Sequence, residues 1–244
     1  MDKLIYTAMT GARAALVRQD TYAQNLAQAS TPGYRAETAA FRAVPLEGSP
    51  TRVFVLDSTT GADLSPGPIT QTGRNLDVAV HGEGWIAVEG KDGREAYTRN
   101  GAFEVSQAGI LQTSGGLAVL SDGGPLSIPP DSTVRIAEDG TVSAVSIANP
   151  KQSLPVGRIK LVNPPADEIQ KSADGLFRLR SGAAAPADER VRVASGAIEG
   201  SNVNVVESLV GMIALARAFD LHMKLLQNAE QNDQQASRLL SVNS

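Results

Sequence analysis

The last forty residues of the chain carry the strongest pattern in the sequence, an apolar stripe that advances in steps of three and four residues. This spacing places the side chains on one face of a helix, as at the a and d positions of a coiled coil. The stripe consists of Leu209, Met212, Ala216, Phe219, Met223 and Leu226. Asn204 precedes it and Glu207 follows three residues later, a pair typical of a helix N-terminus. The sequence therefore predicts a C-terminal helix of roughly 36 residues, about 54 Å long at 1.5 Å per residue.

A second stripe with the same spacing lies at the N-terminus, and most of its side chains are small. It consists of Ile5, Ala8, Ala12, Ala15 and Tyr22. No proline precedes Pro32, so this segment can form one continuous helix that ends before Pro32 and Gly33. An ordinary two-helix hairpin would explain both stripes. However, their apolar side chains are few for the number of residues to be ordered, so we expect the terminal helices to be ordered only beside other subunits.

Between the helices the pattern changes to alternation of apolar and polar residues. Short apolar runs from Leu76 onward predict strands, and four Asp-Gly pairs between them predict tight hairpins. These pairs begin at Asp92, Asp122, Asp139 and Asp174. We predict an α+β fold in which the N- and C-terminal helices form a coiled-coil-like segment around an inserted all-β central domain. The expected boundaries are 1–34 for the first helix, 35–75 for an extended connector, 76–198 for the β domain and 199–244 for the second helix.

Composition excludes several classes of protein. The chain has 244 residues and a formal net charge of −4. Without a Lys/Arg cluster we expect no nucleic-acid partner, and without cysteine there is no disulfide. The longest mostly apolar run is too short to cross a bilayer, which argues against an integral membrane protein. The first residues have no apolar h-region, so we expect no cleaved signal peptide.

The sequence also offers little for catalysis. His81 and His222 are the two histidines, and neither stands at a metal-ligand spacing. There is no Gly-x-Ser-x-Gly motif and no phosphate-binding loop. We therefore predict no catalytic residue, no metal, no cofactor and no small-molecule substrate. Trp85, the single tryptophan, is more simply a core residue than a platform for a ligand.

Several motifs occur in an order that resembles the flagellar rod, hook and hook-associated proteins. The first comprises Asn25, Leu26 and Ala27, followed by Thr31, Pro32, Gly33 and Tyr34. The C-terminal motif runs from Gly196 to Glu207 and includes Ser201, Asn202, Val203 and Asn204. Between them, the segments 75–80, 84–88 and 97–103 are similar to the central domain of the rod proteins. The likeness covers nearly the whole chain.

The resemblance implies a structural subunit of the bacterial flagellar basal body, with the two motifs and the helix stripes as its assembly residues. The opening residues 1–9 favour a proximal-rod member, with a distal-rod member as the alternative. Its partners would be other rod proteins, copies of itself and the flagellar type III export apparatus. The subunit would lie in the periplasmic space and would form, through its terminal helices, part of the shaft that transmits torque.

Two other classes of function stay open at this point. One is an oligomeric β-domain binding module that recognises glycans through Trp85. The other is an enzyme of unrecognised type. A chain without its terminal helices would separate the module from the rod subunit, because only the module would work without them.

Overall fold

The computed structural model describes residues 2–46, 49–146 and 153–242. The chain divides into two compact units. One comprises residues 1–28, 37–61 and 203–244, and the other comprises residues 29–36 and 62–202. The second unit is the β unit. It includes residues 29–36, 62–75 and 199–202, because their backbones bond to its strands. The sequence had predicted that these residues belong to the terminal segments and the connector.

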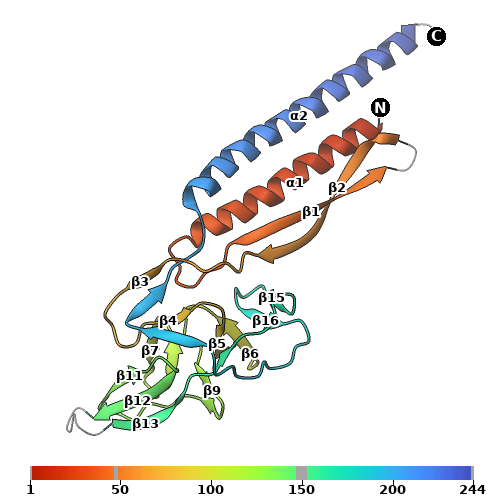
Figure 1. Ribbon diagram of the computed structural model, residues 1–244. Coiled ribbons are helices and arrows are strands. Elements are labelled where there is room, and N and C mark those ends of the chain that lie inside the picture. The colour runs from red at the N-terminus through yellow and green to blue at the C-terminus, as the bar shows by residue number, and fades with distance from the viewer. Residues whose placement is uncertain (1, 47–48, 147–152, 243–244) are drawn as a thin grey trace. The chain divides into compact units, whose positions relative to one another are not determined.

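Two long helices make up most of the first unit, which we call the helical unit. Helix α1 spans Asp2–Ala27 and helix α2 spans Val205–Val242. They lie side by side and run in opposite directions (Figure 1). Gly11 of α1 faces the ring of His222, and Gly211 of α2 faces the ring of Tyr22. The two predicted terminal helices are thus confirmed. No helix among the described residues is long and apolar enough to cross a membrane.

Local signals explain where α2 begins and where α1 ends. The Oδ1 atom of Asn204 accepts a hydrogen bond of 3.1 Å from the backbone N–H of Glu207, as the N-terminal pattern predicts. At the end of α1, the N–H of Gln28 bonds to the carbonyl groups of both Gln24 and Asn25 at 3.1 Å. Gly33 follows with a positive φ of 67°, a conformation that costs glycine little.

The region 35–75, predicted as an extended connector, is extended but largely paired. Strands β1 (Glu37–Leu46) and β2 (Ser49–Ala62) form a two-stranded sheet, and β1 packs along α1. Strand β3 (Ile69–Gln71) pairs with β18 (Ala197–Glu199). Pairing satisfies backbone groups that an unpaired segment would leave to water.

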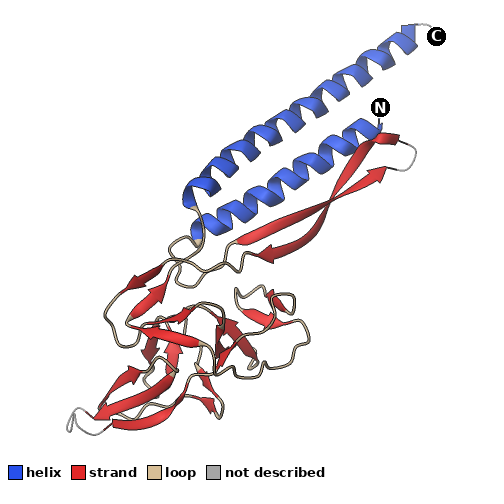
Figure 2. Cartoon of the chain, in the orientation of Figure 1, coloured by secondary structure: helices blue, strands red, loops and turns tan. Residues whose placement is uncertain are grey.

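The β unit is built from short antiparallel strands (Figure 2). Its five-stranded sheet has the order β14-β5-β6-β16-β15, and a three-stranded sheet has the order β11-β12-β13. Strand β17 pairs with β4, β7 with β8, and β9 with β10. The strands not yet bounded are β4 (Val78–His81), β5 (Trp85–Glu89), β6 (Glu95–Thr98), β7 (Phe103–Val105), β8 (Leu111–Thr113), β9 (Leu120–Ser121), β10 (Gly124–Pro125), β11 (Ser132–Ile136), β12 (Thr141–Ser146), β13 (Ser153–Arg158), β14 (Leu161–Val162), β15 (Ile169–Lys171), β16 (Phe177–Leu179) and β17 (Arg192–Ser195).

All four Asp-Gly pairs lie at the turns of hairpins, as predicted. They connect β5 to β6, β9 to β10, β11 to β12 and β15 to β16. Gly93, Gly140 and Gly175 have φ values of 73°, 85° and 81°, which tight hairpin turns require. In the β9–β10 turn the positive φ falls at Gly124 instead.

The central sheet separates two apolar cores. Along β5, Ile86 and Val88 belong to the larger core, whereas Trp85 and Ala87 belong to the smaller one. Successive side chains of a strand point to opposite faces, which explains this alternation. Trp85 is buried, and its ring centroid lies 4.4 Å from that of Phe177. The core role expected for Trp85 is confirmed, and its ring is not available to stack on a glycan.

Candidate functional site

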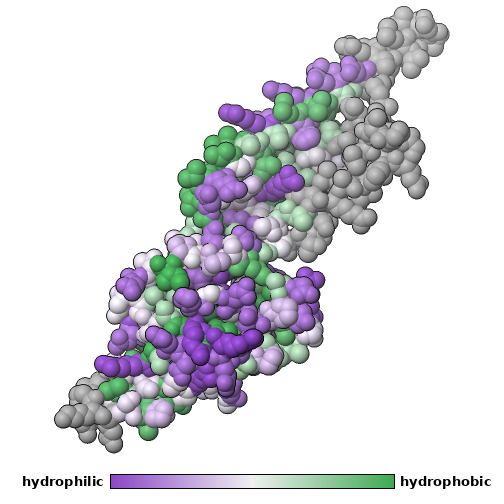
Figure 3. All heavy atoms as spheres, in the orientation of Figure 1, coloured by the Kyte–Doolittle hydropathy of each residue, from purple (hydrophilic) through white to green (hydrophobic). Residues whose placement is uncertain are grey.

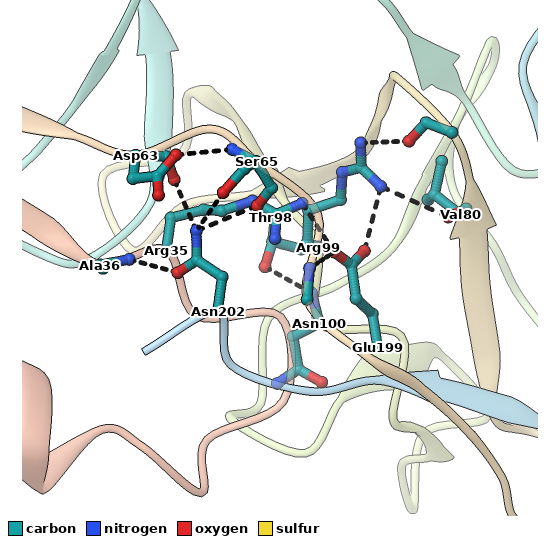
Figure 4. Close-up of polar contacts among 12 residues, drawn as sticks. Arg35, Ala36, Asp63, Ser65, Val80, Thr98, Arg99, Asn100, Glu199 and Asn202 are labelled. Carbon is teal, nitrogen blue, oxygen red and sulfur yellow. Dashed lines mark hydrogen bonds and ion pairs between the residues drawn. The ribbon is translucent and has the colours of Figure 1, made fainter. Parts of the chain in front are cut away.

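The motif segments that lie far apart in the sequence meet around one buried carboxylate, that of Glu199 at the end of β18 (Figure 4). Arg35 comes from the segment after the first motif, and Arg99 follows β6. The three side chains are between 0% and 4% exposed. The site is therefore a charge cluster inside the β unit, which we call the Glu199 cluster.

Both oxygens of Glu199 have partners. Oε1 lies 2.7 Å from Nη2 of Arg35 and accepts a hydrogen bond of 2.9 Å from the N–H of Gly67. Oε2 accepts one of 3.0 Å from Nη1 of Arg99. A buried carboxylate is tolerated when it is paired and fully hydrogen-bonded. This one joins three separate segments of the chain.

The cluster contains two guanidinium groups for one carboxylate, and Trp85 helps to accommodate the extra positive charge. The Cζ atoms of Arg35 and Arg99 lie 5.8 and 5.4 Å from the centroid of the Trp85 ring, within the range of cation–π attraction. Arg99 also donates hydrogen bonds to the carbonyl groups of Val80 and Gly82. Burial lowers the pKa of Arg99 from its usual value, and the charge of Arg35 acts in the same direction, against that of Glu199.

Two glycines allow the backbones to approach closely at this site. A Cβ atom at Gly33 would lie 2.2 Å from the backbone carbon of Arg99, and one at Gly67 would lie 2.2 Å from the carbonyl oxygen of Gly200. The N–H of Gly33 donates a 2.8 Å hydrogen bond to the carbonyl of Glu199. The Thr-Pro-Gly-Tyr motif is thus bonded directly to the C-terminal motif.

Asn202 forms hydrogen bonds with four other residues of the β unit. Its Oδ1 accepts a hydrogen bond of 2.7 Å from the N–H of Ala36, and its Nδ2 donates to the carbonyl groups of Asp63 and Ser65 at 2.9 and 3.0 Å. Its own N–H donates to the carbonyl of Tyr34. Asn202 therefore holds together the segments through which the chain enters and leaves this unit.

In the helical unit, Asn25 has a comparable role. Its side chain is buried, donates a 2.9 Å bond to the carbonyl of Glu37 and accepts a 2.7 Å bond from the N–H of the same residue. These two bonds fix the last turn of α1 to the start of β1. Of the other residues in the two motifs, Leu26, Thr31, Pro32, Ser201 and Val203 are half-buried, and Ala27 is exposed.

The predicted helix stripes are only partly covered within a single chain. On α1 the side chains of Ala8, Ala12 and Ala15 are buried, whereas Ile5 and Tyr22 are half-buried. On α2 the half-buried members are Met212, Phe219 and Leu226. Ala216 is exposed, and Leu209 and Met223 are 45% and 38% exposed.

The Glu199 cluster itself was not foreseen. Arg99 and Glu199 stand inside the recognised motifs and Arg35 directly follows one, but sequence reasoning gave none of them a role. The available signal was a charged residue close to a glycine: Glu199 directly precedes Gly200, and Arg35 and Arg99 each stand two positions from a glycine. No group of three or more potential metal ligands occurs among the described residues. The arrangement is structural, because all its charged groups are enclosed by the fold.

Comparison with known proteins finds several that are similar to this chain over nearly its whole length. Three family models match the chain: Flagella basal body rod protein over residues 5–35, Flagellar hook protein FlgE/F/G D1 domain over residues 79–144, and Flagellar basal body rod FlgEFG protein C-terminal over residues 194–239. The flagellar basal-body rod proteins FlgF of Salmonella typhimurium and Escherichia coli are each 46% identical over 251 residues, covering 99% of this chain and 100% of theirs. FlgG of Buchnera aphidicola from Schizaphis graminum is 28% identical, covering 96% of this chain and 98% of its own.

Proposed function

The chain belongs to the family of flagellar basal-body rod proteins, and we propose that this structural subunit of the rod assembles through its two terminal helices into the proximal part of the shaft. The greater identity to FlgF than to FlgG proteins supports the proximal position. In such a shaft the terminal helices of neighbouring subunits pack together. A contact of this kind, repeated without closing, produces a helical filament.

One observation carries this proposal: residues 209–216, the two turns of α2 that follow its first, are apolar on all sides. Gly211 and His222 lie on the side that contacts α1. A helix has 3.6 residues per turn, so Val206 and Ile213 lie on the opposite side and Val210 lies next to them. They are 69%, 61% and 56% exposed, and Figure 3 shows hydrophobic residues gathered over this part of α2. A helix that is apolar all round is normally buried.

The exposed side of α1 has a similar composition. Tyr6, Met9 and Leu16 are exposed large side chains at helical spacing. Exposed apolar side chains grouped on one side of a helix are typical of a site of protein–protein contact. We propose that neighbouring rod subunits cover both surfaces, and that the α1–α2 pair forms the coiled-coil-like segment suggested by the stripes.

The same reasoning favours helices that are stable only in the assembled rod. Within one chain, the buried face of α1 is made largely of alanine, and a buried alanine contributes little hydrophobic free energy.

We further propose that the subunit is exported by the flagellar type III apparatus without cleavage and lies in the periplasmic part of the rod. Membership of the family supports both points.

The proposal is tested by placing a charge on the outer side of α2. Ile213→Asp leaves the contacts between α1 and α2 intact but puts a carboxylate into the surface that we assign to neighbouring subunits. We expect the variant to be made in normal amounts, to keep a folded β unit and to be absent from isolated basal bodies, so that cells do not swim.

The matched control is Asn228→Asp, which adds the same charge at an exposed polar position of α2. Control cells should swim normally. Normal rods containing the Ile213→Asp chain would show that the outer side of α2 is not an assembly surface.

A further inference from the structure

Each terminal helix has one glycine that accommodates an aromatic ring from the other helix. A Cβ atom at Gly11 would lie 2.5 Å from Cε1 and 2.8 Å from Nε2 of His222. One at Gly211 would lie 2.7 Å from Cζ and 2.8 Å from Cε2 of Tyr22. Atoms in close-packed interiors do not approach so closely. With any other residue at either position, the ring would have to move from this place.

The two contacts have the same spacing along both helices. Tyr22 follows Gly11 by 22 − 11 = 11 residues, and His222 follows Gly211 by 222 − 211 = 11 residues. Eleven residues are close to three turns at 3.6 residues per turn, so the glycine and the ring share one face of each helix. Because the helices are antiparallel, a single alignment forms both contacts at once.

Apolar packing alone would not select this alignment. Ala8, Ala12 and Ala15 are the buried apolar residues described on α1, and a slip of three or four residues exchanges one alanine for another. The same slip would place the ring of His222 against a residue that carries a Cβ atom, such as Ala8 or Ala15. Steric conflict in the wrong register is a standard means of specifying the right one.

The chemistry of His222 points to the same role. Its Nδ1 atom is buried and has no hydrogen-bond partner among the described residues. The imidazole is thus held at the helix contact by its shape and not by a hydrogen bond through Nδ1.

We propose that the contacts Gly11–His222 and Gly211–Tyr22 together form a register key that selects one alignment of α1 on α2. The inference rests on the proposed function, since a rod repeats one interface in every copy and needs identical outer helix faces. A slip of one turn would displace those faces by about 5.4 Å.

Cysteine cross-linking can read the register directly, because the chain has no cysteine of its own. Residue pairs in the selected alignment sum to 233, as in 11 + 222 and 22 + 211, so Ala15 should lie opposite Ala218. The full-length chain carries Ala15→Cys with Ala218→Cys as the native pair, or Ala15→Cys with Leu215→Cys as the slipped pair. Cells with only this copy are treated with a thiol oxidant, and the linked chain is measured by its mobility.

We expect the native pair to link and the slipped pair not to link. Gly11→Leu should reduce the native link to the level of the slipped pair and abolish swimming. The exchange of Gly11→His with His222→Gly, which moves the ring to the other helix, should restore both. The β unit serves as the internal control, because its resistance to proteolysis should not change.

Three results would overturn the register key: an unchanged native link in Gly11→Leu, equal linking of both pairs in the otherwise unaltered chain, or no recovery in the exchanged variant at normal protein level. A failure of the proposed function gives a different outcome. In that case cells that lack the chain altogether would still swim, whatever the links show.

Discussion

The carboxylate of Glu199 lies 2.7 Å from the guanidinium of Arg35, which joins the segment that follows α1 to the segment that precedes α2. Arg99 contacts the second oxygen of the same carboxylate at 3.0 Å. The family motifs at the two ends of the chain are thus bonded to each other through the β unit. Their residues make up one packed site, although the sequence separates them widely.

Replacing Glu199 by glutamine should strongly destabilise the β unit. Glu199→Gln leaves Arg35 and Arg99 buried without a counter-charge, and breaking a buried pair in this way costs about 3–5 kcal/mol. We expect a much lower melting temperature for the full-length chain. The control is Glu189→Gln, whose side chain is 87% exposed. Equal melting temperatures for the two variants would mean that the cluster does not stabilise the fold.

Replacing Gly33 by alanine tests the close approach to Arg99. Gly33→Ala adds a Cβ atom 2.2 Å from a backbone carbon and also strains a residue with positive φ. Gly73→Ala is the matched control, because Gly73 has a φ of 73° but nothing within 4 Å of the added atom. Both variants should lose about 1 kcal/mol to backbone strain, and only Gly33→Ala should lose substantially more in denaturant titrations. Equal losses would contradict the packing described for the motif.

Stability at alkaline pH should depend on Tyr97. Burial, with a hydrogen bond from its hydroxyl to Glu95, raises the pKa of Tyr97 to about 12 from the usual 10.0, although the N–H of Ala185 acts the other way. Above pH 10 the unfolded chain releases this proton while the folded chain keeps it. Stability therefore falls as the pH rises from about 10 to about 12.

The measurement is the melting temperature across this pH range, compared with that of Tyr97→Phe. The variant should melt lower at neutral pH, because it loses two hydrogen bonds, but its melting temperature should fall less steeply above pH 10. Parallel curves would show that Tyr97 keeps an ordinary pKa in the folded protein.

The features predicted correctly from sequence are those governed by local rules. The cap at Asn204, the end of α1 before Pro32 and the Asp-Gly hairpins each depend on a few adjacent residues, and all are present. The segment 35–75 has no such local signal between β1 and β2, so their pairing was not foreseen.

The features that the sequence did not reveal depend on contacts between residues far apart in the chain, or on which side of a helix is buried. Nothing near Glu199 indicates that its partners are Arg35 and Arg99. On α2, residues 209–216 are apolar on both sides of the helix, so the stripe could not show which side faces α1. In the structure Ser208 is buried and the adjacent Leu209 is 45% exposed.

Hydrogen exchange of the full-length chain, free in dilute solution and assembled in isolated rods, shows whether the terminal helices need neighbouring subunits to be ordered. Amide protection reports local opening of each element. We expect rapid exchange in α1 and α2 of the free chain, slow exchange in the same helices within the rod, and slow exchange in the β unit in both states. Terminal helices as well protected in the free chain as in the rod would contradict this expectation.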